Sequence, residues 1–115
     1  MTRHDPLVRV QHMRDHAIEA ITMLGSRTLE QLAADRTLQL ALTQLIEIVG
    51  EAASRIPHDV REQHPLIPWQ LAADMRNRLI HGYDVIDIKL VYVTIKDDLP
   101  TLVKQLESAI QDAER

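Results

Sequence analysis

Hydrophobic residues recur every three or four positions over residues 7–24, the spacing of a helix that buries one face. Asp5 is a typical N-cap residue and Pro6 suits the first helical position, so a helix is expected to begin there. Gly25 and Ser26 are expected to end it. The apolar stripe consists of Leu7, Val10, Met13, Ala17, Ile21 and Leu24.

A second hydrophobic pattern, over residues 36–56, is the longest in the chain. A short helix is expected before it, because Thr28 and Gln31 have the spacing of a capping box, and Asp35 is a cap for the long helix. The apolar face of the long helix is wide, which predicts a central position in the fold. Gly50 costs about 1 kcal/mol relative to alanine in mid-helix and indicates close approach by a neighbouring helix.

Two carboxylates follow one another on the long helix. Glu51 and Arg55 form an i,i+4 pair in the favourable order, and Glu47 lies one turn before Glu51. Two interpretations remain open for these acids. One of them has a partner elsewhere in the fold, or both belong to a solvated acidic strip.

Residues 56–68 contain three prolines and predict a loop with at most one short helix. His58 and His64 in this loop have no partner in the local sequence, so a structural or solvent-facing role is expected. His12 and His16 lie four residues apart on the first helix, at metal-ligand spacing, but lack a third ligand nearby. We therefore expect a solvated face there and no metal or other cofactor.

The remaining pattern predicts two more helices. One starts at Pro68-Trp69, with the tryptophan as a core anchor, and ends at His81-Gly82. The other starts after Asp87, and Pro100 is expected to kink or restart it. Asp97 or Asp98 would then cap the restarted part.

No segment shows the alternation of a β-strand, so the sequence predicts an all-α fold, an antiparallel bundle of four or five helices. With 115 residues, a single domain spanning 1–115 is expected. Phe is absent and there are one Trp and two Tyr, so the core must be aliphatic. A domain this small has a modest core, and an apolar surface that pairs with a second copy would enlarge it.

Composition narrows the functional classes. Cys is absent, which excludes disulfides and thiolate metal sites. Neither a signal peptide nor an apolar run long enough to span a membrane is visible, so a cytoplasmic protein is expected. The net charge of −4 argues against a general nucleic-acid coat, but it leaves room for a nuclease with a local basic cleft.

Residues 76–83 concentrate the polar chemistry of the chain, with the sequence Arg-Asn-Arg-Leu-Ile-His-Gly-Tyr. The simplest interpretation is a helix C-terminus, where basic residues complement the dipole and glycine stops the helix. The alternative is an active site for RNA. The 2′-hydroxyl is a built-in nucleophile, His81 can transfer protons, and Arg76 can stabilise charge on the phosphate oxygens. Asn77 could orient the imidazole from four residues away on the helix, and Arg78 could attract phosphate.

The set Arg76-Asn77-x-x-x-His81-x-Tyr83 resembles the Arg-x4-His-x-Tyr signature of HepT-like toxins of the HEPN superfamily. The similarity extends to Ile48-Val49-Gly50-Glu51-Ala52-Ala53 and Trp69, and from Asp87 to Pro100. The resemblance implies an all-helical homodimer whose paired motifs line one composite cleft. It also implies a metal-independent endoribonuclease with Arg76 and His81 as catalytic residues.

The same resemblance implies a place in a type VII toxin–antitoxin module. The partner is expected to be an MNT-type nucleotidyltransferase antitoxin that transfers AMP from ATP to Tyr83. An adenylate there would add bulk and negative charge beside His81 and exclude the phosphates of RNA. Two other functions remain open. The domain could be a non-catalytic HEPN module that docks to and assists a nucleotidyltransferase, or a plain dimeric scaffold whose motif is only a helix cap.

Overall fold

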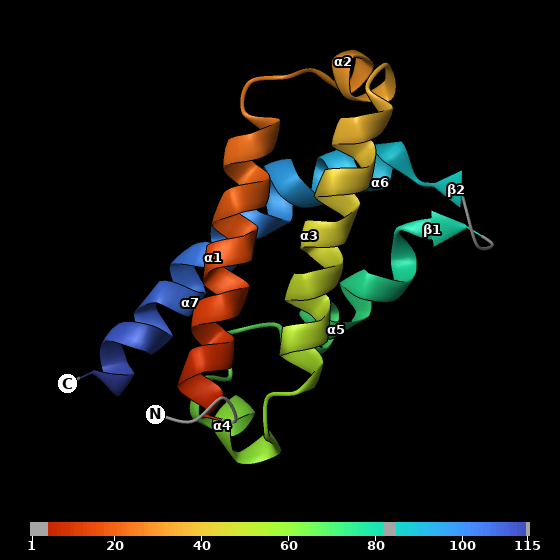
Figure 1. Cartoon of the computed structure of the whole chain (residues 1–115). Coiled ribbons are helices and arrows are strands. Elements are labelled where there is room, and N and C mark those ends of the chain that lie inside the picture. The colour runs from red at the N-terminus through yellow and green to blue at the C-terminus, as the bar shows by residue number, and fades with distance from the viewer. Residues whose placement is uncertain (1–4, 82–84, 115) are drawn as a thin grey trace.

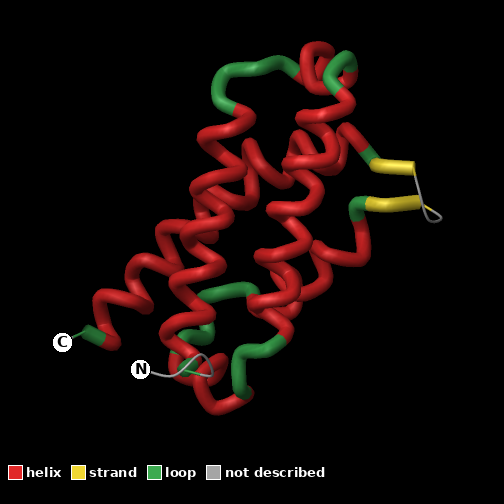
Figure 2. Tube along the Cα trace, in the orientation of Figure 1, coloured by secondary structure: helices red, strands yellow, loops and turns green. Residues whose placement is uncertain are grey.

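The computed structural model describes residues 5–81 and 85–114 and, for His81, the backbone alone. The predicted all-α bundle is confirmed (Figures 1 and 2). Its elements, in chain order, are α1 (Pro6–Leu24), α2 (Leu29–Ala33), α3 (Arg36–Ser54), α4 (His58–Gln63), α5 (Trp69–Arg78), the strands β1 (Ile80–His81) and β2 (Val85–Ile86), α6 (Ile88–Val93), the π-helical segment η1 (Thr94–Asp98) and α7 (Leu99–Ala113).

Helix α3 has the central position that its wide apolar face predicts. It packs against α1 on one side and α5 on the other, and α7 packs against α1 (Figure 1). The core is aliphatic, as expected, with Met13, Leu42, Ile46 and Leu106 fully buried. Trp69 is buried in this core, as the prediction of an aromatic anchor requires. Its indole N–H donates to backbone carbonyl oxygens at the end of α4, at 3.1 and 3.2 Å.

Several helices begin at side chains that accept hydrogen bonds from backbone N–H groups of the first turn. The carboxylate of Asp5 accepts a hydrogen bond from the Leu7 N–H, and the carboxylate of Asp35 accepts one from Leu38. Thr28 and Gln31 form the predicted reciprocal capping box. Gly25 ends α1 with a φ of 57°, in the left-handed region that glycine adopts without strain. Asp87 caps α6 through the Leu90 N–H.

The prediction that Pro100 kinks or restarts the helix is confirmed in part. A new α-helix, α7, starts at Leu99 with Asp98 at its N-cap position and Pro100 in its first turn, but the predicted side-chain cap is not formed. The backbone stays helical through η1 into α7. The π-helical turn explains how the backbone stays helical through Pro100. Proline lacks an N–H and its ring clashes with the carbonyl four residues back, and the wider π ladder just before Pro100 relieves that clash.

The prediction of a helix reaching His81 is wrong, and a pair of two-residue strands lies where the sequence shows no strand pattern. Helix α5 ends at Arg78 with Leu79 as its C-cap. Strand β1 then pairs antiparallel with β2, with Ile80 opposite Ile86 and His81 opposite Val85. This two-stranded ribbon extends from the bundle beyond α3 and α5 (Figures 1 and 2). The Asp87 N–H donates to the Leu79 carbonyl at 2.7 Å, which ties the ribbon to the end of α5.

Candidate active site

Arg76 lies on the face of α5 that packs against α3, and its side chain is held by two groups of α3. The Nη1 group donates to Oε2 of Glu51 at 2.7 Å and to Oγ of Ser54 at 2.9 Å. These contacts join residues 25 and 22 positions apart in the sequence. The Arg76 side chain keeps 37% of its surface exposed, so the guanidinium is anchored and still reachable from solvent.

Gly50 explains how α5 comes close enough for this contact. A Cβ atom at position 50 would lie 3.0 Å from both the N and Cβ atoms of Arg76 and 3.1 Å from the carbonyl oxygen of Ala72. Two of these three atoms belong to the backbone of α5, so a side chain at position 50 would push the whole helix away. The predicted close approach at Gly50 is confirmed, and Arg76 is the residue approached.

The second carboxylate oxygen of Glu51 is occupied by Arg55. Both Nε and Nη2 of Arg55 lie 2.9 Å from Oε1 of Glu51. Hydrogen bonds from Arg55 and then from Arg76 hold the pKa of Glu51 below its ordinary value of 4.5. Glu51 is therefore ionised at neutral pH and carries one negative charge between two positive ones.

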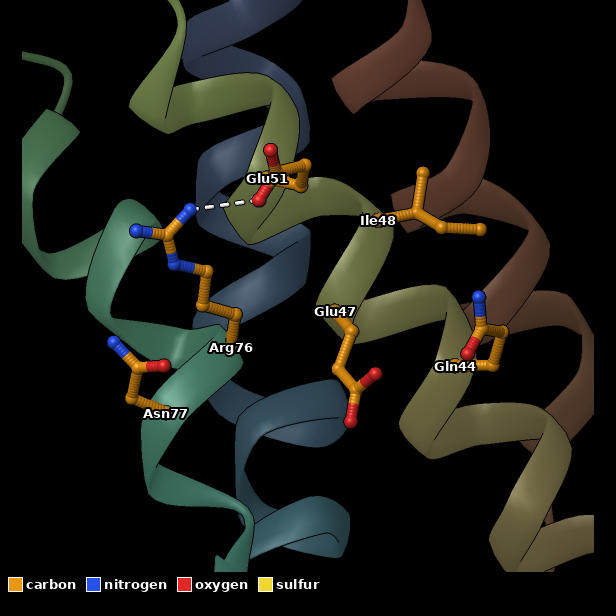
Figure 3. Close-up of a pocket in the computed structure, with 6 residues that line it drawn as sticks. All are labelled: Gln44, Glu47, Ile48, Glu51, Arg76 and Asn77. Carbon is orange, nitrogen blue, oxygen red and sulfur yellow. Dashed lines mark hydrogen bonds and ion pairs between the residues drawn. The ribbon is translucent and has the colours of Figure 1, made fainter.

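The two interpretations left open for the acids of α3 now separate. Glu51 has the long-range partner, Arg76. Glu47 makes no hydrogen bond or ion pair within the described part of the chain, although its side chain is half-buried. Both acids, with Gln44, Ile48, Arg76 and Asn77, line a shallow pocket of about 400 Å³ (Figure 3).

Figure 3 shows how the pocket is arranged around Arg76. Nη1 of Arg76 points at Glu51, whereas the other terminal nitrogen points away from it. Asn77 lies on the same helix beside that second nitrogen, and Glu47 and Gln44 extend from α3 on the opposite side of Arg76. The pocket therefore has an acidic side along α3 and a donor-rich side along α5.

The C-terminal end of α3 attracts further arginines. Nη1 of Arg9 donates to the Arg55 carbonyl at 2.8 Å, and Nη2 of Arg61 donates to the Ala53 carbonyl at 2.9 Å. The last carbonyls of a helix carry its negative dipole end and lack helical partners, so cations are favourable there. Positive charge therefore collects at the C-terminal end of α3 even though the chain has a net charge of −4.

The other motif residues are placed differently from the prediction. Asn77 and Arg78 are exposed on the last turn of α5. His81 lies in β1 rather than on a helix, so the helical spacing that was expected to bring Asn77 and Arg78 to the imidazole does not apply. The ribbon instead fixes the His81 backbone two residues beyond the helix cap. Tyr83 lies outside the described residues.

Four other histidines of the described part of the chain do not line this pocket. Nδ1 of His16 lies 2.7 Å from the backbone oxygen of His12, in an exposed part of α1. His58 is 84% exposed and lies 2.8 Å from Glu62, and His64 ends α4. In residues 5–81 and 85–114, no three His, Asp or Glu side chains are grouped as a metal ion requires. None of the helices described is both long and apolar enough to cross a membrane.

Comparison with known protein families identifies the family of this chain. The profile of the family described as Ribonuclease HepT-like matches residues 13–109. This chain belongs to the HepT-like family. The resemblance inferred from Arg76, His81 and Tyr83 is thereby confirmed.

Relatives cover most of the chain. It is 38% identical over 93 residues to "Probable ribonuclease HepT" of Thermococcus cleftensis, which covers 77% of this chain and 84% of the relative. A "Putative RNase" of Methanocaldococcus jannaschii is 30% identical over 114 residues, with 99% and 94% coverage. Another "Putative RNase", of Caldanaerobacter subterraneus subsp. tengcongensis, is 30% identical over 106 residues, with 92% and 95% coverage. No solved structure matches the chain at a comparable significance.

One participant in the site was missed by sequence reasoning. Ser54 sits at the end of α3, and its contact with Arg76 depends on how α3 and α5 are aligned. Its neighbours in the sequence carry no signal for that contact. The only available signal was its spacing of three from Glu51, which places both on one face of α3.

Proposed function

We propose that this HepT-like protein is an endoribonuclease that cleaves RNA without a metal ion, with Arg76 and His81 as catalytic residues. Membership in the HepT-like family is the observation that carries the proposal. The anchored and solvent-accessible guanidinium of Arg76 supports it, because a fixed planar cation matches two phosphate oxygens.

The chemistry needs few groups. The 2′-oxygen of the substrate attacks the adjacent phosphorus, and the bond to the 5′-oxygen breaks. The products are a 2′,3′-cyclic phosphate and a 5′-hydroxyl. His81 transfers the protons, Arg76 neutralises charge on the phosphate, and Asn77 and Arg78 support the site from the last turn of α5. DNA lacks the 2′-hydroxyl, so the site is specific for RNA.

The active unit in this proposal is a homodimer with two copies of Arg76 and His81 in one cleft. A second pocket, lined in part by Leu40, Ile80 and Ile86, adjoins the first and shares Gln44 and Glu47 with it. Leu40 is 51% exposed there, and Val85 of the ribbon is 58% exposed. This apolar surface beside the pocket supports pairing of two chains at the site.

Regulation in this proposal acts on Tyr83. As the toxin of a toxin–antitoxin pair, the protein is silenced by an MNT-type nucleotidyltransferase. The phenolic oxygen of Tyr83 attacks the α-phosphorus of ATP, and pyrophosphate leaves. The AMP on Tyr83, two residues from His81, then repels and blocks the RNA backbone.

The test of the nuclease is incubation of the purified protein with total RNA in EDTA. The wild-type protein is expected to cleave, and His81→Ala is expected to be inactive. Equal activity of His81→Ala would overturn the catalytic assignment. For regulation, Tyr83→Phe is expected to remain toxic in cells that contain the nucleotidyltransferase, and silencing of that variant would show inhibition by binding instead.

The second candidate function is a non-catalytic module that docks to a nucleotidyltransferase. The net charge of −4 favours this docking function, because a negatively charged protein binds RNA more weakly in general. Intact mass spectrometry separates the two functions. An added AMP on the co-expressed chain, together with no RNA cleavage by the unmodified chain, would support the docking module.

A further inference from the structure

Glu51 and Ser54 both accept hydrogen bonds from Arg76, the proposed catalytic arginine. We propose that they are positioning residues that hold one edge of Arg76, so that its other edge faces the scissile phosphate. The inference rests on the proposed function and deepens it, since it concerns how the catalytic arginine is presented. Three observations carry it: the contact geometry, the orientation of the serine hydroxyl, and the balance of charge.

Within the described residues, the side-chain contacts of Arg76 use one nitrogen. Both Glu51 and Ser54 accept from Nη1, at 2.7 and 2.9 Å. A guanidinium has five N–H donors, and this arrangement leaves those of Nε and Nη2 for another ligand. These two nitrogens form the side-on edge that binds two oxygens of a phosphate. A carboxylate that sequestered Arg76 would occupy that edge, whereas Glu51 binds through Nη1.

Ser54 is oriented to accept rather than to donate. Its hydroxyl donates to the Glu51 backbone carbonyl at 2.7 Å. Its single proton is thereby committed, so its oxygen presents lone pairs to Arg76. Ser54 satisfies a carbonyl in the last turn of α3 and fixes a second acceptor for Nη1 at the same time.

The charge of the cluster formed by Glu51, Arg55 and Arg76 favours phosphate binding, and Glu47 adds an opposing negative charge to the same pocket. Glu51 contacts Arg55 through one oxygen and Arg76 through the other, so the three side chains carry a net charge of +1. If Glu51 contacted Arg76 alone, the pair would have no net charge and would attract phosphate weakly. Sharing Glu51 between two arginines keeps the group attractive to phosphate while Arg76 is fixed.

Glu47 provides the contrast that separates positioning from simple charge. It lies one turn before Glu51 in the same pocket, but it makes no hydrogen bond or ion pair with Arg76. If Glu51 acted only as a negative charge, Glu51→Gln and Glu47→Gln would have the same effect. Both would reduce repulsion of RNA and lower KM.

The experiment measures kcat and KM on a short RNA for the full-length protein and its variants. Glu51→Ala is expected to lower kcat about 10- to 100-fold, the loss that follows when a catalytic group is displaced by about 1 Å. Glu51→Gln keeps an acceptor oxygen and is expected to fall between Glu51→Ala and wild type. Ser54→Ala should lower kcat, and Ser54→Thr, which keeps the hydroxyl, should restore it. Glu47→Gln should lower KM instead.

The control is Glu107→Gln, which removes the same charge from an exposed position on α7 and should match wild type. Thermal unfolding of every variant verifies that it is folded. The inference is overturned if folded Glu51→Ala keeps wild-type kcat, or if Glu51→Gln reproduces the lower KM of Glu47→Gln. Increased activity of Glu51→Ala would show that Glu51 sequesters Arg76.

A second measurement does not depend on cleavage. Nitrogen NMR reports rotation about the Nε–Cζ bond of Arg76, which should be slow in the wild-type protein and fast in Glu51→Ala. Equal rotation rates would overturn the held guanidinium. Absence of RNA cleavage by the wild-type protein would instead refute the proposed function, so the two failures are distinguishable.

Discussion

Gly50→Ala is the substitution that most directly links helix packing to the site. In an isolated helix it would stabilise, because alanine is favoured over glycine by about 1 kcal/mol in a helix interior. In this fold the new Cβ would lie 3.0 Å from the N and Cβ atoms of Arg76 and 3.1 Å from the Ala72 carbonyl oxygen. These atoms cannot rotate away as a side-chain end would, so α5 must move by a few tenths of an ångström.

The magnitude follows from these two opposing effects. Overpacking of this kind costs about 1–3 kcal/mol, which exceeds the gain in helix propensity. We expect a net loss of about 1 kcal/mol, or roughly 4 °C in Tm for a domain of this size. Because the displaced residue is Arg76, we also expect kcat on RNA to fall by about tenfold.

Gly25→Ala is the matched control. Gly25 has a φ of 57°, and its added Cβ would meet only ordinary contacts, with the nearest atom at 3.5 Å. Alanine in the left-handed region costs about 1 kcal/mol, so the loss in Tm should be similar. Gly25 ends α1, and the atoms nearest its added Cβ belong to Thr22 and Arg27 rather than to Arg76, so kcat should be unchanged. A Gly50→Ala protein that is more stable than wild type and equally active would refute this reasoning.

Three further predictions concern pH, stability and salt. The lowered pKa of Glu51 means that its contribution to stability is present above its ordinary pKa of 4.5 and is lost as the pH falls through the lower value in the folded state. Acid unfolding of Glu51→Gln should therefore show a weaker pH dependence below about pH 4.5 than acid unfolding of the wild-type protein, and equal pH dependence of the two proteins would contradict the lowered pKa. Trp69→Phe removes an indole N–H that donates to two backbone carbonyls, and it should lower the free energy of unfolding by about 2 kcal/mol. Urea denaturation followed by circular dichroism measures this change, and an unchanged midpoint would contradict the anchor role of Trp69. Arg55→Ala removes the net positive charge of the Glu51 cluster and should reduce the slope of log KM against log salt concentration by about 1. An unchanged slope would show that the charge of Arg55 does not contribute to the attraction of RNA.

The sequence predictions were accurate where a structural feature is decided by residues close together in the sequence. The caps at Asp35 and Thr28 were predictable, because a side chain and an N–H three residues later decide them. Gly50 was informative for a similar reason: a residue that weakens its own helix indicates a packing requirement. The central place of α3 followed from its wide apolar face.

The features that were missed depend on contacts over longer distances. Two-residue strands are too short to show alternation, so the ribbon that carries His81 left no pattern in the sequence. The π-helical turn before Pro100 is an adjustment of the backbone to its neighbours. The contact of Arg76 with Glu51 and Ser54 requires the register between α3 and α5, which hydrophobic spacing alone does not fix.

The chemistry of the RNA ends tests the central claim most directly. A defined RNA is incubated with the wild-type protein in EDTA, and the ends of the fragments are identified by mass spectrometry. Attack by the 2′-oxygen, stabilised by Arg76, predicts 2′,3′-cyclic phosphate and 5′-hydroxyl ends that are absent with Arg76→Ala. Cleavage that requires added metal, or fragments that carry 5′-phosphate and 3′-hydroxyl ends, would contradict the proposed mechanism.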